Sequence, residues 1–180
     1  QTNSVVRFRI SNGSTLFGVI DVELFDLDKP ITVTNFLRHV QRGDYNKSIL
    51  HDLRPGFAVS GGYGTVPSPN SSSPFVALTR IPQDDPITNE FHSGTLRNNI
   101  FGTLAMAKET TDPDSATSRW FFNLGDNSDG TGTNLNSALD GHTVFGQIKA
   151  GTTGGTVLNN LNNLSLGNGI VNMFEQAYVQ

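Results

Sequence analysis

The fold is best indicated by the stretch His51-Asp52-Leu53-Arg54-Pro55-Gly56-Phe57-Ala58-Val59-Ser60-Gly61-Gly62. Residues 50–59 predict a β-strand interrupted at Pro55, because proline has no backbone N–H to donate to a sheet. Side chains two residues apart lie on the same face of an ideal strand, about 6–7 Å apart. Asp52 and Arg54 are therefore expected to be neighbours on one face of this strand.

The composition limits what the chain can be. Its 180 residues fit a single domain, 1–180, with a sizeable core. The net charge of −4 argues against a nucleic-acid surface, because binding phosphates needs clustered Lys and Arg. No apolar run approaches the roughly 18–20 residues that span a bilayer. The absence of cysteine excludes disulfides and Cys-ligated metals. The richness in Asn, Gly, Ser and Thr and the start at Gln1 favour a periplasmic or secreted protein, with a cytoplasmic location as the alternative.

Working outward from the quoted stretch, the hydrophobic pattern predicts many short strands and few helices. Residues 5–10 and 17–25 alternate apolar and polar side chains, as the strands of a half-buried hairpin do. Residues 30–40 form the best helix, with a one-sided apolar stripe, a proline at its start and Gly43 beyond its end. Further expectations are strands at 102–107, 119–124, 143–148 and weakly 170–179, a helix at 157–164, and a long ordered loop over 63–90.

Many short strands separated by turns predict a mainly β fold. A closed antiparallel barrel is the preferred architecture, because closure removes exposed sheet edges. Composition and periodicity alone fit several all-β folds equally well.

A series of motifs between about Val5 and Ile148 resembles those of the cyclophilins, which are peptidyl-prolyl cis/trans isomerases. In that family the quoted stretch usually reads Phe-His-Arg-(two apolar)-Pro-Gly-Phe-(apolar)-x-Gln-Gly-Gly. The matching segments, in chain order, are Glu23-Leu24-Phe25, Pro30-x-Thr32-x-x-Asn35-Phe36, His51, Pro55-Gly56-Phe57, Gly61-Gly62, Asn89-Glu90-Phe91, Gly102–Ala107, the bacterial-like Ser115–Leu124 and Leu139–Gly146. The resemblance implies a closed eight-stranded antiparallel barrel capped by two helices, with a substrate groove on one outer face.

The resemblance also implies an apolar pocket for a proline ring. By motif match, the pocket is lined by Phe57, Met106, Phe121 and either Leu135 or Leu139. His142 matches the histidine that closes the pocket, and Ala107 a backbone contact to the peptide. His51 and Ser60 complete the expected substrate-binding set. Without the motif match, Met106 and Phe121 are better explained as barrel core.

Two positions depart from the family pattern. Asp52 stands where the family has arginine, and Ser60 stands where it has glutamine. The family's guanidinium favours a pyramidal, less conjugated proline nitrogen, which is electrostatic preorganisation. Arg54 or Arg119, the latter at a family glutamine position, could compensate. The alternatives are a solvated Arg54 and an Arg119–Asp52 ion pair, and we expect Arg119 to project into the groove close to Asp52.

The sequence therefore leads to a weak prolyl isomerase that acts on X-Pro bonds in unfolded or extended chains. A non-catalytic module that binds proline-containing segments is the alternative, which Asp52 favours, and a scaffold with a closed groove is a third. The four histidines, at 39, 51, 92 and 142, show no zinc-binding spacing. We expect a monomer without metal, cofactor or nucleic-acid partner.

Overall fold

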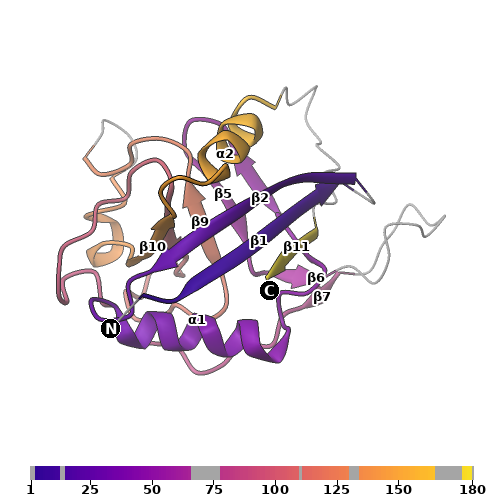
Figure 1. The fold of residues 1–180 in the computed structure, drawn as a ribbon. Helices are drawn as coiled ribbons and strands as arrows, with labels where there is room; N and C mark the ends of the chain where they lie inside the picture. The colour runs from indigo at the N-terminus through magenta and orange to yellow at the C-terminus, as the bar shows by residue number, and fades with distance from the viewer. Residues whose placement is uncertain are drawn as a thin grey trace.

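Antiparallel pairing joins eleven strands into one curled sheet. The computed structural model describes residues 3–12, 15–65, 78–109, 111–129, 134–164 and 176–179. Within these ranges the elements are β1 Val5–Asn12, β2 Thr15–Leu24, α1 Pro30–Arg42, β3 Ser48–Ile49, β4 Asp52–Arg54, β5 Ala58–Gly61, β6 Gly64–Thr65, β7 Thr79–Arg80, β8 Thr103–Met106, β9 Trp120–Asn123, the 3-10 turn η1 Ala138–Asp140, β10 Val144–Ile148, α2 Gly154–Asn162 and β11 Gln176–Val179. Figure 1 shows α1 and α2 at opposite ends of the sheet.

The hairpin of β1 and β2 confirms the alternating pattern. Val6 pairs with Val22 and Phe8 with Ile20, and all four side chains are buried. The strand register shifts after Ile10, which introduces a bulge near the end of the hairpin. The apolar face of the hairpin therefore covers the core, while its charged face lies outside.

Helix α1 also follows its sequence signals. Pro30 occupies the first turn, and Gly43 ends the helix in a left-handed conformation with φ of 76°. The N–H groups of Ile31 and Thr32 donate to the carboxylate of Glu90, at 3.1 and 2.7 Å. A side chain from a distant loop thus satisfies two first-turn donors that have no partner inside the helix.

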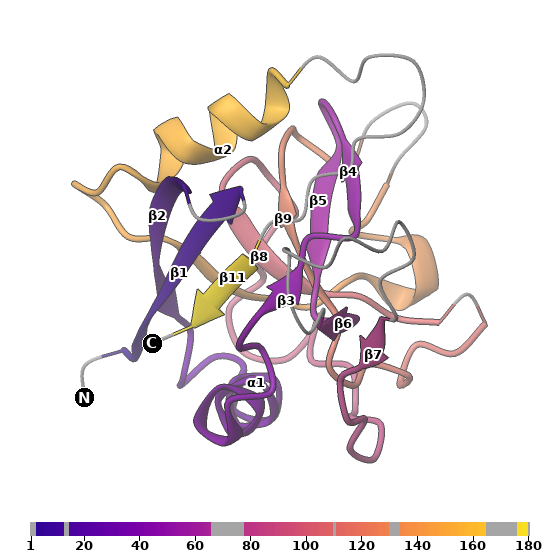
Figure 2. The ribbon, with the colours of Figure 1, turned by 90° about the vertical axis from the view of Figure 1, so that its right-hand side faces the viewer.

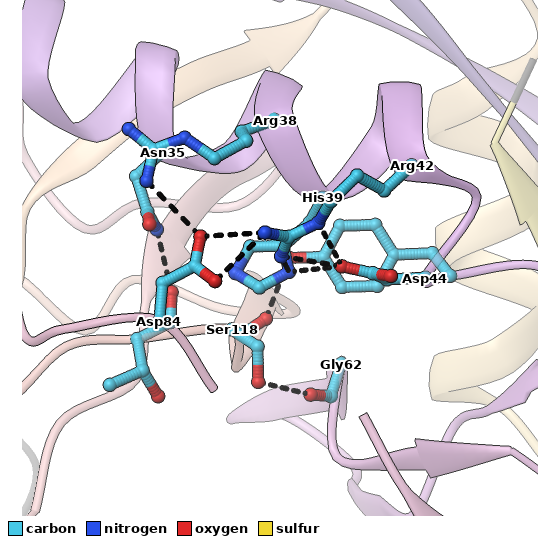
Figure 3. A network of polar contacts seen from close by, with 10 residues as sticks. Asn35, Arg38, His39, Arg42, Asp44, Gly62, Asp84 and Ser118 are labelled. Atoms are coloured by element: carbon cyan, nitrogen blue, oxygen red, sulfur yellow. Dashed lines mark hydrogen bonds and ion pairs between the residues drawn. The ribbon is translucent and has the colours of Figure 1, made fainter. Parts of the chain in front are cut away.

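A polar network ties the other end of α1 to a distant segment (Figure 3). The fully buried His39 lies 2.7 Å from a carboxylate oxygen of Asp44 through its Nδ1. Arg42 donates to Asp44 at 2.7 Å and to Asp84 at 2.8 Å. Arg38 also reaches Asp84, at 3.1 Å. These contacts fix the segment around Asp84 against the helix.

Two apolar clusters lie on opposite faces of β8 and β9. The main core contains Phe8, Phe36, Trp120 and Phe122, with the ring of Phe8 edge-on to Trp120 at 5.0 Å and to Phe122 at 5.2 Å. The second cluster is smaller and consists of Phe25, Ala58, Ala105, Phe121 and Val144, with Phe57, Ala107 and Leu135 packed against it. Because side chains alternate along a strand, Trp120 and Phe121 belong to different clusters, as expected.

The expected barrel is seen as a curled antiparallel sheet. Its strand order is β4-β5-β9-β8-β10-β2-β1-β11-β3-β6-β7, so β4 and β7 stand at the ends of the pairing in the described ranges. Figure 2 shows β4 beside β5 and β3 beside β11, and β3 directly precedes β4 along the chain. The closed eight-stranded barrel stays a prediction.

The late elements differ in their boundaries from the sequence prediction. Helix α2 begins at Gly154, three residues earlier than expected, and it buries Val157, Leu158 and Leu161. The last strand, β11, covers only Gln176–Val179 of the predicted range 170–179. Residues 165–175 and part of the long loop, 66–77, lie outside the described residues.

Candidate functional site

A pocket of about 270 Å³ lies on the outer face of β4, β5 and β9, over the second apolar cluster. The strand register aligns its parts, because Asp52 pairs with Ser60, Ser60 with Phe121, and Phe121 with Ala105. Side chains in one such row share a face of the sheet. The residues that line the pocket are Asp52, Arg54, Phe57, Ala58, Ser60, Ala107, Lys108, Phe121, Leu135 and His142.

The floor of the pocket is apolar and rigidly supported. Phe121 is 5% exposed and packs in the second cluster with Ala58 and Ala105. Phe57 follows the turn at Pro55-Gly56, where Gly56 takes a φ of 75° that favours glycine. The carbonyl of Phe57 accepts a 2.8 Å hydrogen bond from the N–H of Leu124. The pocket therefore offers an aromatic surface that is held in place by a strand and its neighbouring turn.

His142 stands at one side of this surface in a fixed orientation. Its Nδ1 lies 3.0 Å from the carbonyl oxygen of Met106, and its ring is edge-on to Phe121 at 5.6 Å. A carbonyl only accepts, so Nδ1 carries the proton of the neutral ring and Nε2 is the acceptor. Burial lowers the pKa of His142, the positive charge of Lys108 lowers it further, and the bond to Met106 opposes both effects. The ring is thus kept neutral near physiological pH.

Lys108 is a lining residue that the sequence did not single out. Its ammonium donates to the carbonyl oxygens of Leu139 at 2.7 Å and Gly141 at 2.5 Å. Both Leu139 and Asp140 have left-handed backbones, with φ of 52° and 60°, which is uncommon for residues with a side chain. Burial lowers the pKa of Lys108. The lysine therefore braces a strained turn at the rim, and its place directly after the matched strand 102–107 was the only sequence signal.

The charged side of the pocket differs from the expectation. Arg54 Nε lies 3.0 Å from Asp52 Oδ2, and the two side chains are 65% and 40% exposed. Arg119 is ion-paired with Glu109, and it is not among the residues that line the pocket. Among the described residues Arg119 is thus paired with Glu109 and Asp52 with Arg54, and the alternative of an Arg119–Asp52 ion pair is not what the structure shows.

Strand order explains which partner each arginine takes. In the sheet, β5 lies between β9 and β4. The chain after β8 runs directly beside Arg119, and the Ala107 N–H donates to the Arg119 carbonyl at 3.0 Å. Glu109, three residues after Met106 at the end of β8, is the carboxylate that pairs with Arg119, and Asp52 pairs with Arg54 on its own strand.

Three other predicted residues lie outside the pocket. Met106 is 1% exposed and packs in the main core, because alternation sends it to the face opposite Ala105 and Ala107. Leu139 contributes its carbonyl to Lys108, and the leucine that lines the pocket is Leu135. His51 packs its ring against Tyr63, with ring centroids 5.2 Å apart. Ala58, which the sequence analysis missed, lines the pocket.

Comparisons with known proteins identify the family of this chain. Residues 5–176 match the family model described as cyclophilin type peptidyl-prolyl cis-trans isomerase/CLD. The chain belongs to the cyclophilin family. This cyclophilin is 37% identical over 138 residues to the peptidyl-prolyl cis-trans isomerase cyp18 of Streptomyces antibioticus, an alignment that covers 77% of this chain and 75% of that protein. It is 36% identical over 137 residues to a peptidyl-prolyl cis-trans isomerase of Acinetobacter baylyi, covering 76% of this chain and 64% of that protein.

A solved structure shows the same fold. It is a cyclophilin type peptidyl-prolyl cis-trans isomerase of Cryptosporidium parvum, crystallised in the presence of the dipeptide Ala-Pro. The likeness has a TM-score of 0.62 at 21% identity and covers 90% of this cyclophilin and 87% of that chain. In the described ranges of this cyclophilin, neither helix is long and apolar enough to cross a bilayer, and no three His, Asp or Glu side chains are grouped to hold a metal.

Proposed function

We propose that this cyclophilin is a peptidyl-prolyl cis/trans isomerase of reduced activity that acts on X-Pro bonds in unfolded or extended chains. The observation that carries the proposal is the pocket itself. It combines an aromatic surface of Phe57 and Phe121, a half-buried neutral histidine at one side, and a guanidinium from Arg54 at the other.

The chemistry requires no covalent step. The X-Pro bond resists rotation because amide resonance imposes a barrier of about 18–20 kcal/mol. Phe57, Phe121 and Leu135 would bury the proline ring and remove water from the bond. A guanidinium that donates to the proline nitrogen stabilises the pyramidal geometry of the twisted state, in which resonance is lost. Arg54 is the arginine among the lining residues that can supply this donor.

The ion pair with Asp52 accounts for the proposed low activity. Asp52 accepts from Arg54 Nε at 3.0 Å, so it competes with a substrate nitrogen for the guanidinium donors. The carboxylate also places negative charge where the lone pair of the proline nitrogen develops. Ser60, at the family's glutamine position, offers a shorter hydrogen-bonding group on the same face.

A non-catalytic peptide-binding module is the second candidate, and the exposure of Arg54 favours it. The Arg54 side chain is 65% exposed, so water weakens its electrostatic effect on a substrate. The apolar floor does not depend on Arg54, and it would bind a proline ring even without catalysis.

A paired measurement separates the two functions. Isomerisation of an Ala-Pro peptide is followed in a protease-coupled assay, and binding of the same peptide is followed by titration. We expect Arg54→Met to lower kcat/KM and leave the affinity nearly unchanged. Arg7→Met is the matched control, since Arg7 is also ion-paired to an aspartate, Asp21, and does not line this pocket. Binding without any isomerisation by the wild type would establish the module instead.

The proposal includes closure of the sheet into the eight-stranded barrel. Support comes from β3, which pairs with β11, and β4, which pairs with β5, with two residues between them in sequence. Counted as one strand, β3 and β4 would join the two sides of the sheet. The His51 N–H donates to the Ser60 carbonyl at 3.0 Å, so amide exchange at His51 should be as slow as in β5.

A further inference from the structure

Three asparagines form a hydrogen-bonded cluster beside the pocket, and we call them the asparagine cluster. Asn99 and Asn123 are fully buried, and Asn127 is 1% exposed. Asn127 Nδ2 donates to Asn123 Oδ1 at 2.7 Å, and Asn123 Nδ2 donates to Asn99 Oδ1 at 3.2 Å. Asn123 Nδ2 also donates to Thr103 Oγ1 at 2.9 Å, which anchors the cluster on β8. The amides therefore form one chain from Asn127 to Asn99.

The two ends of this chain reach three lining residues of the pocket. Asn127 Nδ2 donates to the Phe57 carbonyl at 2.9 Å. Asn99 Nδ2 donates to the His142 carbonyl at 3.0 Å and to the Leu135 carbonyl at 3.4 Å. Phe57, Leu135 and His142 come from separate segments, none of which is a strand at the point of contact. The cluster thus joins pocket walls that no strand ladder holds together.

Backbone bonds tighten the same connection. The Asn127 N–H donates to the Asn99 carbonyl, and the Leu135 N–H donates to the Asn127 carbonyl, both at 2.8 Å. The His142 N–H then donates to the Leu135 carbonyl at 2.8 Å. Each member of the cluster is therefore fixed by its main chain as well as by its side chain.

Burying three amides is costly unless each finds partners. Apolar side chains would fill the same space at lower desolvation cost, so stability alone does not explain the choice of asparagine. A planar amide offers donors and an acceptor in fixed directions, and a satisfied buried network specifies one geometry. The relative placement of the pocket walls is the geometry that this network determines.

We propose that Asn99, Asn123 and Asn127 are positioning residues that set the spacing of Phe57, Leu135 and His142. They make no contact with a bound peptide, and their effect reaches it through the three carbonyls. The peptide arm of the test rests on the proposed function, while the placement of the walls does not.

The test uses Asn127→Asp in the full chain. An aspartate keeps the size of the side chain but has no donor for the Phe57 carbonyl or for Asn123 Oδ1. Asn35→Asp is the matched control. Asn35, labelled in Figure 3, is 2% exposed and donates to the Thr117 carbonyl at 2.6 Å. It is not among the residues that line the pocket. Asn127→Ala serves as a second variant, since it removes the donor without introducing a charge.

Two readouts are taken well below the unfolding midpoint of each variant. Without peptide, we expect amide NMR signals of Phe57, Leu124 and His142 to shift in Asn127→Asp and in Asn127→Ala, and to stay in place in Asn35→Asp. With an Ala-Pro peptide, we expect about three- to tenfold weaker binding for the Asn127 variants and unchanged binding for Asn35→Asp.

The outcomes are separable. A folded Asn127 variant with unshifted pocket signals would overturn the proposal, and so would unchanged affinity alongside measurable wild-type binding. If Asn127→Asp does not fold, the same two readouts on Asn127→Ala decide the proposal. Absence of binding by the wild type would contradict the proposed function, and the NMR signals would still decide whether the cluster positions the walls.

Discussion

β4 and β9 both flank β5, and they build opposite kinds of pocket wall. All four residues of β9, Trp120–Asn123, are buried, and Phe121 packs against a defined apolar cluster. β4 presents Asp52 and Arg54, whose ion pair is 40% and 65% exposed. Packing on both faces fixes the side chains of β9, whereas an exposed ion pair contributes little to stability and is easily rearranged. Binding energy should therefore come from β9, and the chemistry of rotation from β4.

Phe121→Ala should give the largest effect, and it tests the buried pocket wall formed by β9. Removing a buried phenylalanine ring costs about 3–5 kcal/mol of unfolding free energy, because a cavity remains. It should also weaken binding of a proline peptide by about 1–3 kcal/mol, as loss of an aromatic wall implies. Denaturant unfolding and peptide titration measure the two effects. Arg54→Ala on β4 is the comparison, and equal losses of stability in the two variants would contradict the contrast.

Asp52→Arg tests the exposed pocket wall formed by β4. It restores the residue that the cyclophilin pattern has at this position, between the matched His51 and Pro55-Gly56-Phe57. We expect kcat/KM on a proline peptide to rise at least about tenfold, which corresponds to roughly 1.4 kcal/mol of barrier. Asp52→Asn is the control, since it removes the charge without adding a guanidinium. An unchanged rate in folded Asp52→Arg would show that the pocket is incompetent for another reason.

The sequence predicted the buried half of the site better than the exposed half. Alternation correctly placed Trp120 and Phe121 on opposite faces of one strand, because successive side chains of a strand point to opposite faces. Both faces of β9 are buried, so each side chain has a fixed place. The same rule places Met106 in the main core, against the motif match that assigned it to the pocket. The partner of Arg119 could not be predicted, because it depends on which strand lies beside β9.

The asparagine cluster was also beyond the sequence. Its members are spread over residues 99–127, and the carbonyls that they hold lie at positions 57, 135 and 142. Every residue has a backbone carbonyl, so the type of the accepting residue does not indicate such a hydrogen bond. Only the folded chain shows that three ordinary asparagines share one set of partners.

Acid pH tests the histidine beside the buried wall. Folding lowers the pKa of His142, so below the ordinary value of about 6.5 the unfolded chain takes up a proton more readily than the native protein. The stability contributed by the neutral ring is present above that pH, and it falls as the pH drops toward the lowered native pKa. Unfolding free energies measured between pH 7.5 and 5, in steps of about 0.5 pH unit, should show the decline.

The histidine variants test how much of this decline comes from His142, because burial also lowers the pKa of His51. His142→Gln should lose part of it, and His92→Gln, at an exposed position, should keep it. Identical pH profiles for wild type and His142→Gln would mean that His142 titrates alike in the folded and unfolded chains. The buried wall would then impose no constraint on its neighbouring ring.

Arg119→Gln should give the smallest effect, although Arg119 lies only two residues before Phe121. The guanidinium is paired with Glu109, and the two side chains are 25% and 65% exposed, so solvent screens the attraction. The Nε atom is buried without a hydrogen-bond partner among the described residues, a cost that offsets part of the gain from the ion pair. A double-mutant cycle of Arg119→Gln with Glu109→Gln should give a coupling of about 0–1 kcal/mol.

Isomerase activity decides whether Arg119 belongs with the buried or the exposed half of the site. Because its partner is Glu109 and not Asp52, Arg119→Gln leaves the Asp52–Arg54 pair intact. We therefore expect kcat/KM to change less than in Arg54→Met, and affinity for peptides with acidic flanks to stay the same. A loss of activity as large as that of Arg54→Met would show that Arg119 leaves Glu109 when a peptide binds. The guanidinium that assists rotation would then come from beside β9, and the division of roles between β4 and β9 would fail.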